Sequence, residues 1–306
     1  METFTYHGSD GCPLYAISLG SGPPLVLLHG GGPDHHSLVP LAERLTDRHT
    51  VILPDVRGYG RSVCTGPASH TWSRYAADVA ALLDHLGFQR AAVGGTGLGA
   101  TVTQRTCLEH PGRVRAALLI SVEDIEDDEA KQAEVAFMDA FAQRVRTDGI
   151  EAAWAPVLPD LAPVVGALVR DAIPRSDPAS IAAAAAIGHD RSFRSVDELA
   201  AITTPTLIFP GMDQRHPIAL AENAARVMPN GRLAPVSLSD TLRTAADLAD
   251  AFAPAIRRFL AEHDVPNVAF ETLSVPDEAL GTSGPQRVVL HHMRRGEDQA
   301  RQRGGQ

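Results

Sequence analysis

Short, largely apolar runs alternate with amphipathic helical patterns over the first part of the chain. Runs typical of strands buried on both faces of a parallel sheet lie at 25–28, 51–53, 91–93 and 114–120. Between them, apolar residues recur at helical spacing, as in 37–47 and 72–87. Residues 1–20 alternate weakly around glycines and predict an opening β-hairpin. The alternation predicts an α/β fold with a mostly parallel sheet and right-handed crossovers.

The strand signal disappears between Glu123 and about Ala201. This stretch is rich in alanine, has a helical pattern and is interrupted by Pro156, Pro159, Pro174 and Pro178. We interpret it as a helical lid of four or five short helices inserted into the sheet domain. Strand patterns return at 205–209 and 232–236, and helical patterns flank them at 217–228 and 244–262.

These patterns predict four segments along the chain. The core domain comprises 1–122 and 202–263, the helical lid 123–201, and a C-terminal extension 264–306. Within the extension, 268–273 and 287–290 predict a small hairpin, and 294–306 has the polar composition of a disordered segment.

Composition narrows the class of partner. The net charge is −10 and the calculated pI about 5.7, so we expect no nucleic-acid partner and no anionic membrane surface. The three cysteines form no disulfide pattern, and neither a leader nor an apolar run of membrane length is found, which predicts a cytoplasmic protein. We expect a small-molecule ligand or substrate and no cofactor. A homodimer is also possible from the sequence, and His291 and His292 of one subunit could then reach the other subunit.

Three motifs follow predicted strands in a fixed order. They are a His-Gly-Gly-Gly loop at 29–32, the segment Asp-Val-Arg-Gly-Tyr-Gly-Arg-Ser at 55–62, and a strand, glycine cluster and helix over 91–111. In this order the motifs resemble the α/β-hydrolase superfamily over roughly residues 1–263, and in particular its small ester, enol-lactone and carbon–carbon-bond hydrolases. The resemblance implies an α/β-hydrolase fold with a helical lid and a strained nucleophile elbow after the third motif's strand.

The elbow pattern G-x-S-x-G has glycine at its central position here, because the sequence reads Gly95-Thr96-Gly97-Leu98-Gly99. The resemblance therefore assigns the nucleophile position to Gly97, which has no side chain. Thr96 could serve only if the turn were shifted by one residue, and Leu98 would then occupy a position that needs a small residue.

The other two positions of a Ser-His-Asp triad are also altered. The acid position after strand 205–209 reads Gln214, with Asp213 beside it and Glu123 or Asp124 as alternatives after strand 114–120. The loop at 235–241, where the histidine is expected, contains none. We conclude that the usual loops cannot assemble the triad, which needs a base beside the nucleophile and an acid that orients the base.

Backbone groups of an oxyanion hole do not depend on those side chains. The resemblance assigns this role to the amides of Leu98 and Gly31, with Gly32 and Thr96 as further ligand-binding candidates. The N-terminus of the elbow helix favours an anion or a polarised carbonyl at the same place. The alternative is that these glycines only permit tight turns.

Several charged residues lie on predicted loops at the carboxyl edge of the sheet, where α/β folds bind ligands. We list His36, Asp213 and His216 with Gly97 as catalytic candidates, and interpret His29 as structural. The alternative for His35 and His36 is a solvated loop. Asp34, His36 and His216 could hold a metal, although their spacing matches no strong motif, so we expect none. Arg57, Arg61 and Arg215 could hold a substrate carboxylate, but we interpret them as partners of neighbouring acids. His189 and Asp190 could face a pocket beneath the lid, but we interpret them as having no catalytic part. Trp72 and Trp154 are interpreted as packing residues.

Three functions remain open. The first is an atypical, non-hydrolytic enzyme of lyase, cyclase or isomerase type that acts on a small carbonyl-containing metabolite. The second is a binding pseudo-hydrolase without turnover. The third is an ester or lactone hydrolase that uses direct attack by water.

Overall fold

The computed structural model describes residues 1–264, and the predicted hairpin and disordered stretch of the C-terminal extension lie outside them. Eight strands form one sheet in the order β1-β2-β4-β3-β5-β6-β7-β8. The strands are β1 Glu2–His7, β2 Pro13–Leu19, β3 Pro24–Leu28, β4 Thr50–Pro54, β5 Ala91–Thr96, β6 Val114–Ile120, β7 Thr206–Phe209 and β8 Gly231–Leu233. The pairs β1–β2 and β2–β4 are antiparallel and the other pairs parallel, which confirms the predicted fold class.

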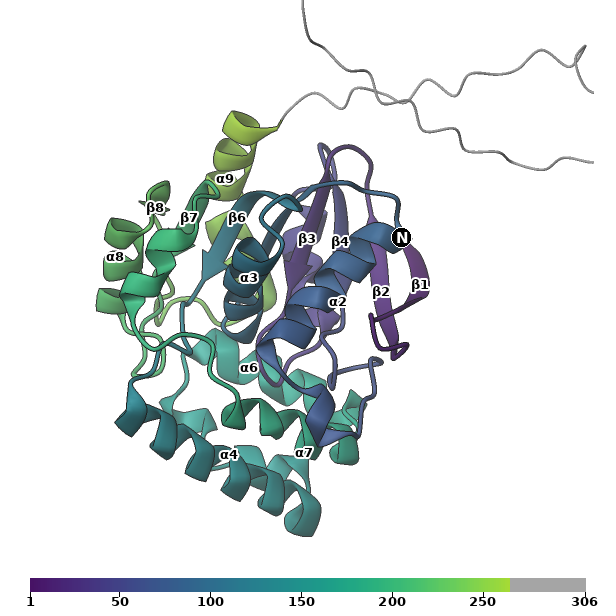
Figure 1. Cartoon of the computed structure of the whole chain (residues 1–306), viewed down its shortest axis with the longest axis vertical. Helices are drawn as coiled ribbons and strands as arrows, with labels where there is room; N and C mark the ends of the chain where they lie inside the picture. Colours follow the sequence, from purple (N-terminus) through teal and green to yellow (C-terminus); the bar gives the residue numbers. More distant parts are fainter. Residues whose placement is uncertain (265–306) are drawn as a thin grey trace, which may run out of the picture. The chain divides into compact units, whose positions relative to one another are not determined.

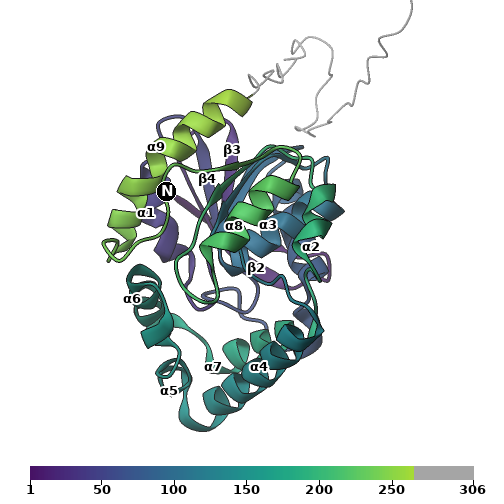
Figure 2. The ribbon, with the colours of Figure 1, turned by 90° about the vertical axis from the view of Figure 1, so that its left-hand side faces the viewer.

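Helices cover both faces of this sheet (Figures 1 and 2). Their bounds are α1 Val39–Glu43, α2 Trp72–His85, α3 Leu98–Glu109, α4 Asp128–Asp148, α5 Ile150–Trp154, α6 Pro163–Ala172, α7 Pro178–Ala184, α8 Ile218–Val227 and α9 Ala245–His263. Figure 2 shows α1 and α9 on one face, and α2, α3 and α8 on the other. No helix in residues 1–264 is long and apolar enough to cross a membrane.

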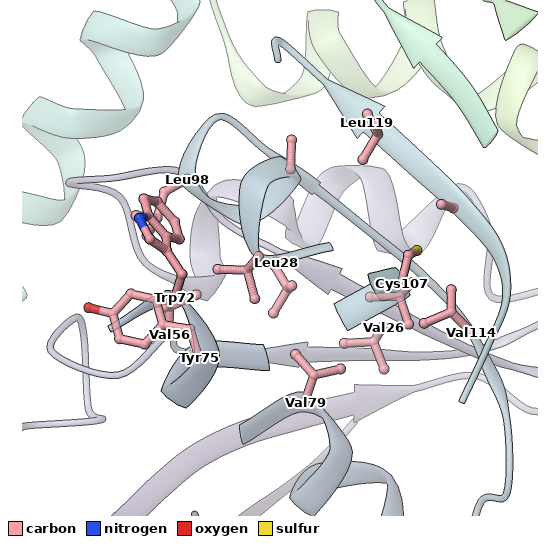
Figure 3. Close-up of a cluster of buried hydrophobic side chains, with 14 of the residues drawn as sticks. Val26, Leu28, Val56, Trp72, Tyr75, Val79, Leu98, Cys107, Val114 and Leu119 are labelled. Atoms are coloured by element: carbon pink, nitrogen blue, oxygen red, sulfur yellow. The ribbon is translucent and has the colours of Figure 1, made fainter. Parts of the chain in front are cut away.

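Alternate residues of the central strands supply two separate cores. In β3, Val26 and Leu28 face the cluster beneath α2 and α3, whereas Leu25 and Leu27 face the cluster beneath α1 and α9. This division arises because successive side chains of a strand point to opposite faces of the sheet. Figure 3 shows part of the first cluster, in which Val26 and Leu28 lie among side chains from α2, α3 and β6. The strands are therefore buried on both faces, as their continuous apolar runs predict.

Two predicted elements differ from those observed. The helix expected at 37–47 is a short 3-10 turn, His35–Leu38, followed by α1, because Pro40 stands in the first turn of α1 and begins a new helix there. The strand expected at 232–236 is only β8, since Ala234 makes one more bond to Ile208 and Pro235 has no N–H to continue the ladder.

The segment between β6 and β7 is helical. It contains α4 to α7, which we call the helical insertion, and Figure 1 shows these helices beyond one end of the sheet. The helices were expected to be short, but α4 is 21 residues long. Asp127 caps its start by accepting bonds from Glu129 and Ala130, and Gly149 ends it with a φ of +90°. The insertion follows β6 directly and therefore lies at the carboxyl end of the parallel strands.

Candidate active site

Gly97 stands at the apex of the turn between β5 and α3. Its backbone has φ +49° and ψ −116°, a conformation that L side chains rarely adopt. The turn is also closely packed, because a Cβ on Gly95 would lie 2.4 Å from the carbonyl carbon of Gly99 and a Cβ on Gly99 2.3 Å from the oxygen of Leu28. Thr96 is the last residue of β5 and Leu98 the first of α3, so the apex is Gly97 itself.

A cavity of about 140 Å³ lies over this turn. Its floor contains Thr96, Gly97 and Leu98, and its polar wall includes Glu123, Asp124, Arg215 and His216. The remaining wall is mostly apolar. Side chains of the helical insertion that line it include Phe137, Met138, Phe141, Trp154, Val157, Leu161, Val165, Leu168 and Ile181. The cavity therefore offers one polar end at the turn and an apolar body beneath the insertion.

The carboxylate of Glu123 reaches the place that a side chain at position 97 would occupy. A Cβ on Gly97 would lie 2.8 Å from Glu123 Oε1 and 3.5 Å from His216 Nε2. The other oxygen, Oε2, accepts a hydrogen bond from Arg215 Nε at 2.5 Å and lies 3.3 Å from His216 Nε2. Oε1 has no hydrogen-bond partner within residues 1–264. One oxygen is therefore held by two cations, while the other faces the turn.

The structure brings together two of the catalytic candidates from the sequence, Asp213 and His216. The backbone N–H of His216 donates to Asp213 Oδ1 at 2.9 Å, and the ring nitrogen Nδ1 lies 2.7 Å from the same oxygen. The histidine therefore comes from the loop after β7, not from the later loop at 235–241. Sequence reasoning expected the triad histidine in the later loop and listed His216 only as a separate catalytic candidate; the structure shows that Asp213 orients it.

The charges in this cluster hold each other in ionised form. Burial opposes protonation of His216, but Glu123 and Asp213 outweigh it and raise the pKa of His216 to about 10. Burial likewise opposes ionisation of Glu123, but Arg215 and His216 lower the pKa of this carboxyl to about 2. At neutral pH the turn is therefore faced by a carboxylate and an imidazolium.

The neighbouring carboxyl behaves in the opposite way. Burial, reinforced by the charge of Glu123, holds the pKa of Asp124 well above its ordinary value. Asp124 Oδ2 lies 2.9 Å from the Thr101 hydroxyl. Both Ser121 (φ +60°) and Asp124 (φ +59°) adopt the left-handed conformation, so the chain after β6 bends sharply on either side of Glu123. This strain directs Glu123 toward Gly97.

Arg215 links the cluster to the helical insertion. Besides Glu123 it contacts Glu134 of α4, with its Nη2 2.9 Å from Oε1, and it lies 3.7 Å from Asp124. Arg57 is paired elsewhere, with Asp78 and Asp10, and Arg61 lies over the Tyr15 ring. Arg57 and Arg215 therefore pair with acids as interpreted, whereas Arg61 lies over an aromatic ring instead.

The remaining histidine candidates lie away from the polar wall. His36 is half exposed, its Nδ1 is 3.1 Å from Asp34 Oδ1, and it does not line the cavity. His35 is buried against Asp55. Asp34 already binds Arg175 of the insertion through both carboxylate oxygens, which disfavours a cation beside it. His29 lies between Gly30 O and the Val56 N–H, in agreement with a structural role.

The two residues whose amides are assigned to an oxyanion hole, Gly31 and Leu98, are neighbours in the structure. A Cβ on Gly31 would be 3.9 Å from Leu98 Cβ and 3.8 Å from the Tyr59 hydroxyl. In the part of the chain that the structure describes, neither amide N–H has a hydrogen-bond partner. Gly32 serves a different purpose, because its φ is +98° and a Cβ there would lie 2.6 Å from Trp154. Trp72 and Trp154 both line the cavity and also pack against hydrophobic clusters.

Sequence reasoning did not single out Tyr59, which lines the cavity next to the Gly31 loop. The available signal was its position between Gly58 and Gly60 in the second motif. Glu123 was named only as an alternative acid, because nothing in the sequence reports that the chain after β6 folds back over Gly97.

Comparison with known proteins identifies the family. The family model described as alpha/beta hydrolase fold matches residues 23–158. A non-heme haloperoxidase from Rhodococcus erythropolis is 32% identical over 248 residues, which are 74% of this chain and 88% of that protein. A fluoroacetate dehalogenase from Burkholderia sp is 33% identical over 107 residues. The match to this dehalogenase covers 35% of it, and the matches to two epoxide hydrolases from Siraitia grosvenorii cover 42% of each.

A solved structure leads to the same assignment. A thermophilic esterase from Thermogutta terrifontis, solved with malate bound, has a TM-score of 0.72 and 26% identity, and the match covers 86% of this chain and all of that one. The sheet order, the strained turn after β5 and these similarities lead to one conclusion: this chain belongs to the α/β-hydrolase-fold family.

Proposed function

We propose that this protein is an enzyme that performs acid–base chemistry on a small carbonyl-containing molecule without a covalent nucleophile at the elbow. The reaction is of lyase, cyclase or isomerase type. The observation that carries this proposal is the position of Glu123 Oε1. This oxygen has no hydrogen-bond partner within residues 1–264, and it lies 2.8 Å from the point where a Cβ on Gly97 would be. Gly97 is then the residue that makes room for a catalytic carboxylate supplied by another segment.

Each group has a distinct part in such a reaction. Glu123 Oε1 accepts a proton from the substrate, while Arg215 and His216 hold the other oxygen in place. The negative charge that develops on the carbonyl oxygen is stabilised by the amides of Gly31 and Leu98 at the N-terminus of α3. His216, oriented by Asp213, is positioned to donate a proton to a leaving or rearranging oxygen.

The substrate is small and mostly apolar. The polar groups gather at one end of a cavity of about 140 Å³, and aromatic and aliphatic side chains of the helical insertion form most of the remaining wall. We propose that the insertion acts as a lid that excludes water from the turn. The net charge of −10 supports a small-molecule enzyme with no nucleic-acid partner.

A second candidate is hydrolysis by direct attack of water. The same Glu123 oxygen would then take a proton from water held over Gly97. The names of the relatives support this candidate, since the Thermogutta terrifontis protein is an esterase. The two candidates need the same residues and differ in whether water enters the product.

The deciding experiment compares the parent chain with Glu123→Gln and with Glu151→Gln, an exposed glutamate of α5 as matched control. Each is tested for hydrogen–deuterium exchange of small apolar ketones and for hydrolysis of esters and lactones. Exchange that Glu123→Gln abolishes and Glu151→Gln preserves supports the proposal. Ester turnover with the same dependence supports water attack. Binding without turnover in every assay overturns both in favour of a binding protein.

A serine-directed fluorophosphonate probe with intact-mass readout tests the missing nucleophile independently. We expect no adduct on the parent chain, because Gly97 offers no side chain. A stable adduct on Thr96 would contradict the proposal and reinstate a nucleophile at the shifted position.

A further inference from the structure

We propose that the Tyr59 hydroxyl is a third hydrogen-bond donor to the substrate's carbonyl oxygen, and that the substrates are therefore enolisable carbonyl compounds. This inference rests on the proposed acid–base function and adds to it a catalytic residue and a substrate class. Nothing in the three sequence motifs assigns a role to this tyrosine.

The position of Tyr59 is fixed by its two neighbours. Gly58 has φ +91°, and a Cβ there would lie 2.7 Å from the His70 ring and 2.9 Å from Ala184. Gly60 has φ +50°, and a Cβ there would lie 2.5 Å from the Asp55 carboxylate. Side chains are excluded on both sides, so the loop is closely packed. Tyr59 therefore projects from a rigid turn.

The ring and hydroxyl of Tyr59 face the elbow. The ring contacts the edge of His29 at a centroid distance of 5.6 Å and an interplanar angle of 75°. The hydroxyl oxygen lies 3.8 Å from the place of a Cβ on Gly31, and Tyr59 lines the cavity. Within the described part of the chain the hydroxyl has no hydrogen-bond partner. Tyr75 differs, because its buried hydroxyl lies 2.8 Å from His70 Nδ1.

Burial and nearby negative charges keep the Tyr59 hydroxyl protonated. Burial, aided by the nearby charges of Glu123 and Asp124, holds the pKa of Tyr59 well above its ordinary value. The group therefore acts as a donor and not as a base. It lies near Gly31, and Gly31 in turn lies near Leu98. We therefore infer that the hydroxyl and the two amides act on one substrate oxygen.

The weak basicity of Glu123 explains why a third donor matters. A carboxylate with a pKa of about 2 accepts a carbon-bound proton only if the resulting negative charge is strongly stabilised. In the proposed step, Glu123 Oε1 takes the α-proton, the C–H electron pair forms the C=C bond of an enolate, and the carbonyl oxygen becomes anionic. Glu123 then returns the proton to the same or a conjugated carbon, which leaves the atom count of the substrate unchanged.

The first test measures exchange of the α-protons of 4-phenylbutan-2-one in D₂O by proton NMR. We expect Tyr59→Phe to lower kcat by about 10²- to 10³-fold, the usual effect of one lost oxyanion donor, with little change in KM. Tyr75→Phe, the same chemical change outside the cavity, is expected to stay within about threefold. Full activity of Tyr59→Phe would overturn the inference and leave the proposed function intact.

The second test needs no turnover. In a Glu123→Gln background, which mimics the protonated base, 4-nitrophenol serves as an oxyanion analogue whose ionisation is read from its absorbance. Adding Tyr59→Phe is expected to weaken binding of the phenolate at least tenfold and to raise the pKa of the bound phenol. Adding Tyr75→Phe is expected to change neither.

The two tests separate the two hypotheses. Exchange that depends on Glu123 but not on Tyr59, or phenolate binding that is unchanged in Tyr59→Phe, sinks the inference alone. No exchange by the parent chain, with phenolate binding that still depends on Tyr59, sinks the proposed function and supports the donor. Absence of saturable phenol binding in Glu123→Gln counts against the inference.

Discussion

Two clusters in this protein pair an arginine with buried carboxylates but have different consequences. In the first, Arg57 binds Asp78 through Nε and Nη2 and Asp10 through both terminal nitrogens, at distances between 2.7 and 2.9 Å. In the second, Arg215 binds Glu123 and Glu134, and His216 adds a second cation. Both clusters bury several charges next to the sheet.

The two clusters differ in whether one carboxylate oxygen remains without a hydrogen-bond partner. Asp78 uses both of its oxygens on Arg57, and the Arg57 cluster lines no part of the cavity. Glu123 uses only Oε2, and its Oε1 faces Gly97 at the floor of the cavity. A closed network of ion pairs can only stabilise or destabilise the fold, whereas an open one retains an acceptor for a ligand. We therefore interpret the Arg57 cluster as structural and the Arg215 cluster as catalytic.

The two clusters are expected to differ most in how their loss affects catalytic activity. Glu123→Gln should lower turnover by about 10²- to 10⁴-fold, the usual contribution of a general base, while the fold is retained. The measurement is exchange or product formation, alongside a urea denaturation curve for each protein. If turnover were unchanged with the fold intact, the distinction between the two clusters would be lost.

Arg57→Ala should produce the reverse pattern. Its removal takes both bonded cation contacts from Asp78, which is deeply buried, so we expect a loss of about 3–5 kcal/mol in the free energy of unfolding. At temperatures where the variant stays folded, its kcat should remain within a few-fold of the parent value. A stable but inactive Arg57→Ala would mean that this cluster reaches the site.

The pH dependence of stability should carry the signature of His216. Its folded-state pKa of about 10 lies above the unfolded value of about 6.5, so its contribution is fully present below pH 6.5 and is lost as the pH rises toward 10. We expect a loss of up to about 5 kcal/mol across this window, because about 1.4 kcal/mol accompanies each unit of a pKa difference of about 3.5. His216→Gln should flatten this part of the profile, which chemical denaturation at several pH values would reveal.

Gly97→Ser should not create a serine hydrolase. The introduced serine must adopt a φ of +49°, which costs about 1–2 kcal/mol, and its Cβ would lie 2.8 Å from Glu123 Oε1. We expect slightly lower stability, lower acid–base activity and no fluorophosphonate adduct, since the neighbouring His216 is protonated and cannot act as the base. Rapid labelling of the introduced serine together with new ester turnover would show that the cluster can serve as an ordinary triad.

The strand and helix patterns were sufficient to predict the fold class. Continuous apolar runs become strands buried on both faces, and glycines crowded around position 97 become a tight turn, because both depend on local sequence. The same reasoning placed Gly97 at the apex and brought Asp213 and His216 onto one loop, since only two residues lie between them. It also selected His36, which the structure leaves half exposed outside the cavity.

Only the tertiary structure decided which side chains meet at the turn. Glu123 follows β6 and His216 follows β7, and their approach to Gly97 depends on the neighbouring positions of β5, β6 and β7 in the sheet and on strained bends after β6. Tyr59 comes from the loop after β4 and approaches Gly31 from a different segment. Sequence spacing reports contacts within one element, whereas these contacts join five loops whose separation is set by strand order and packing.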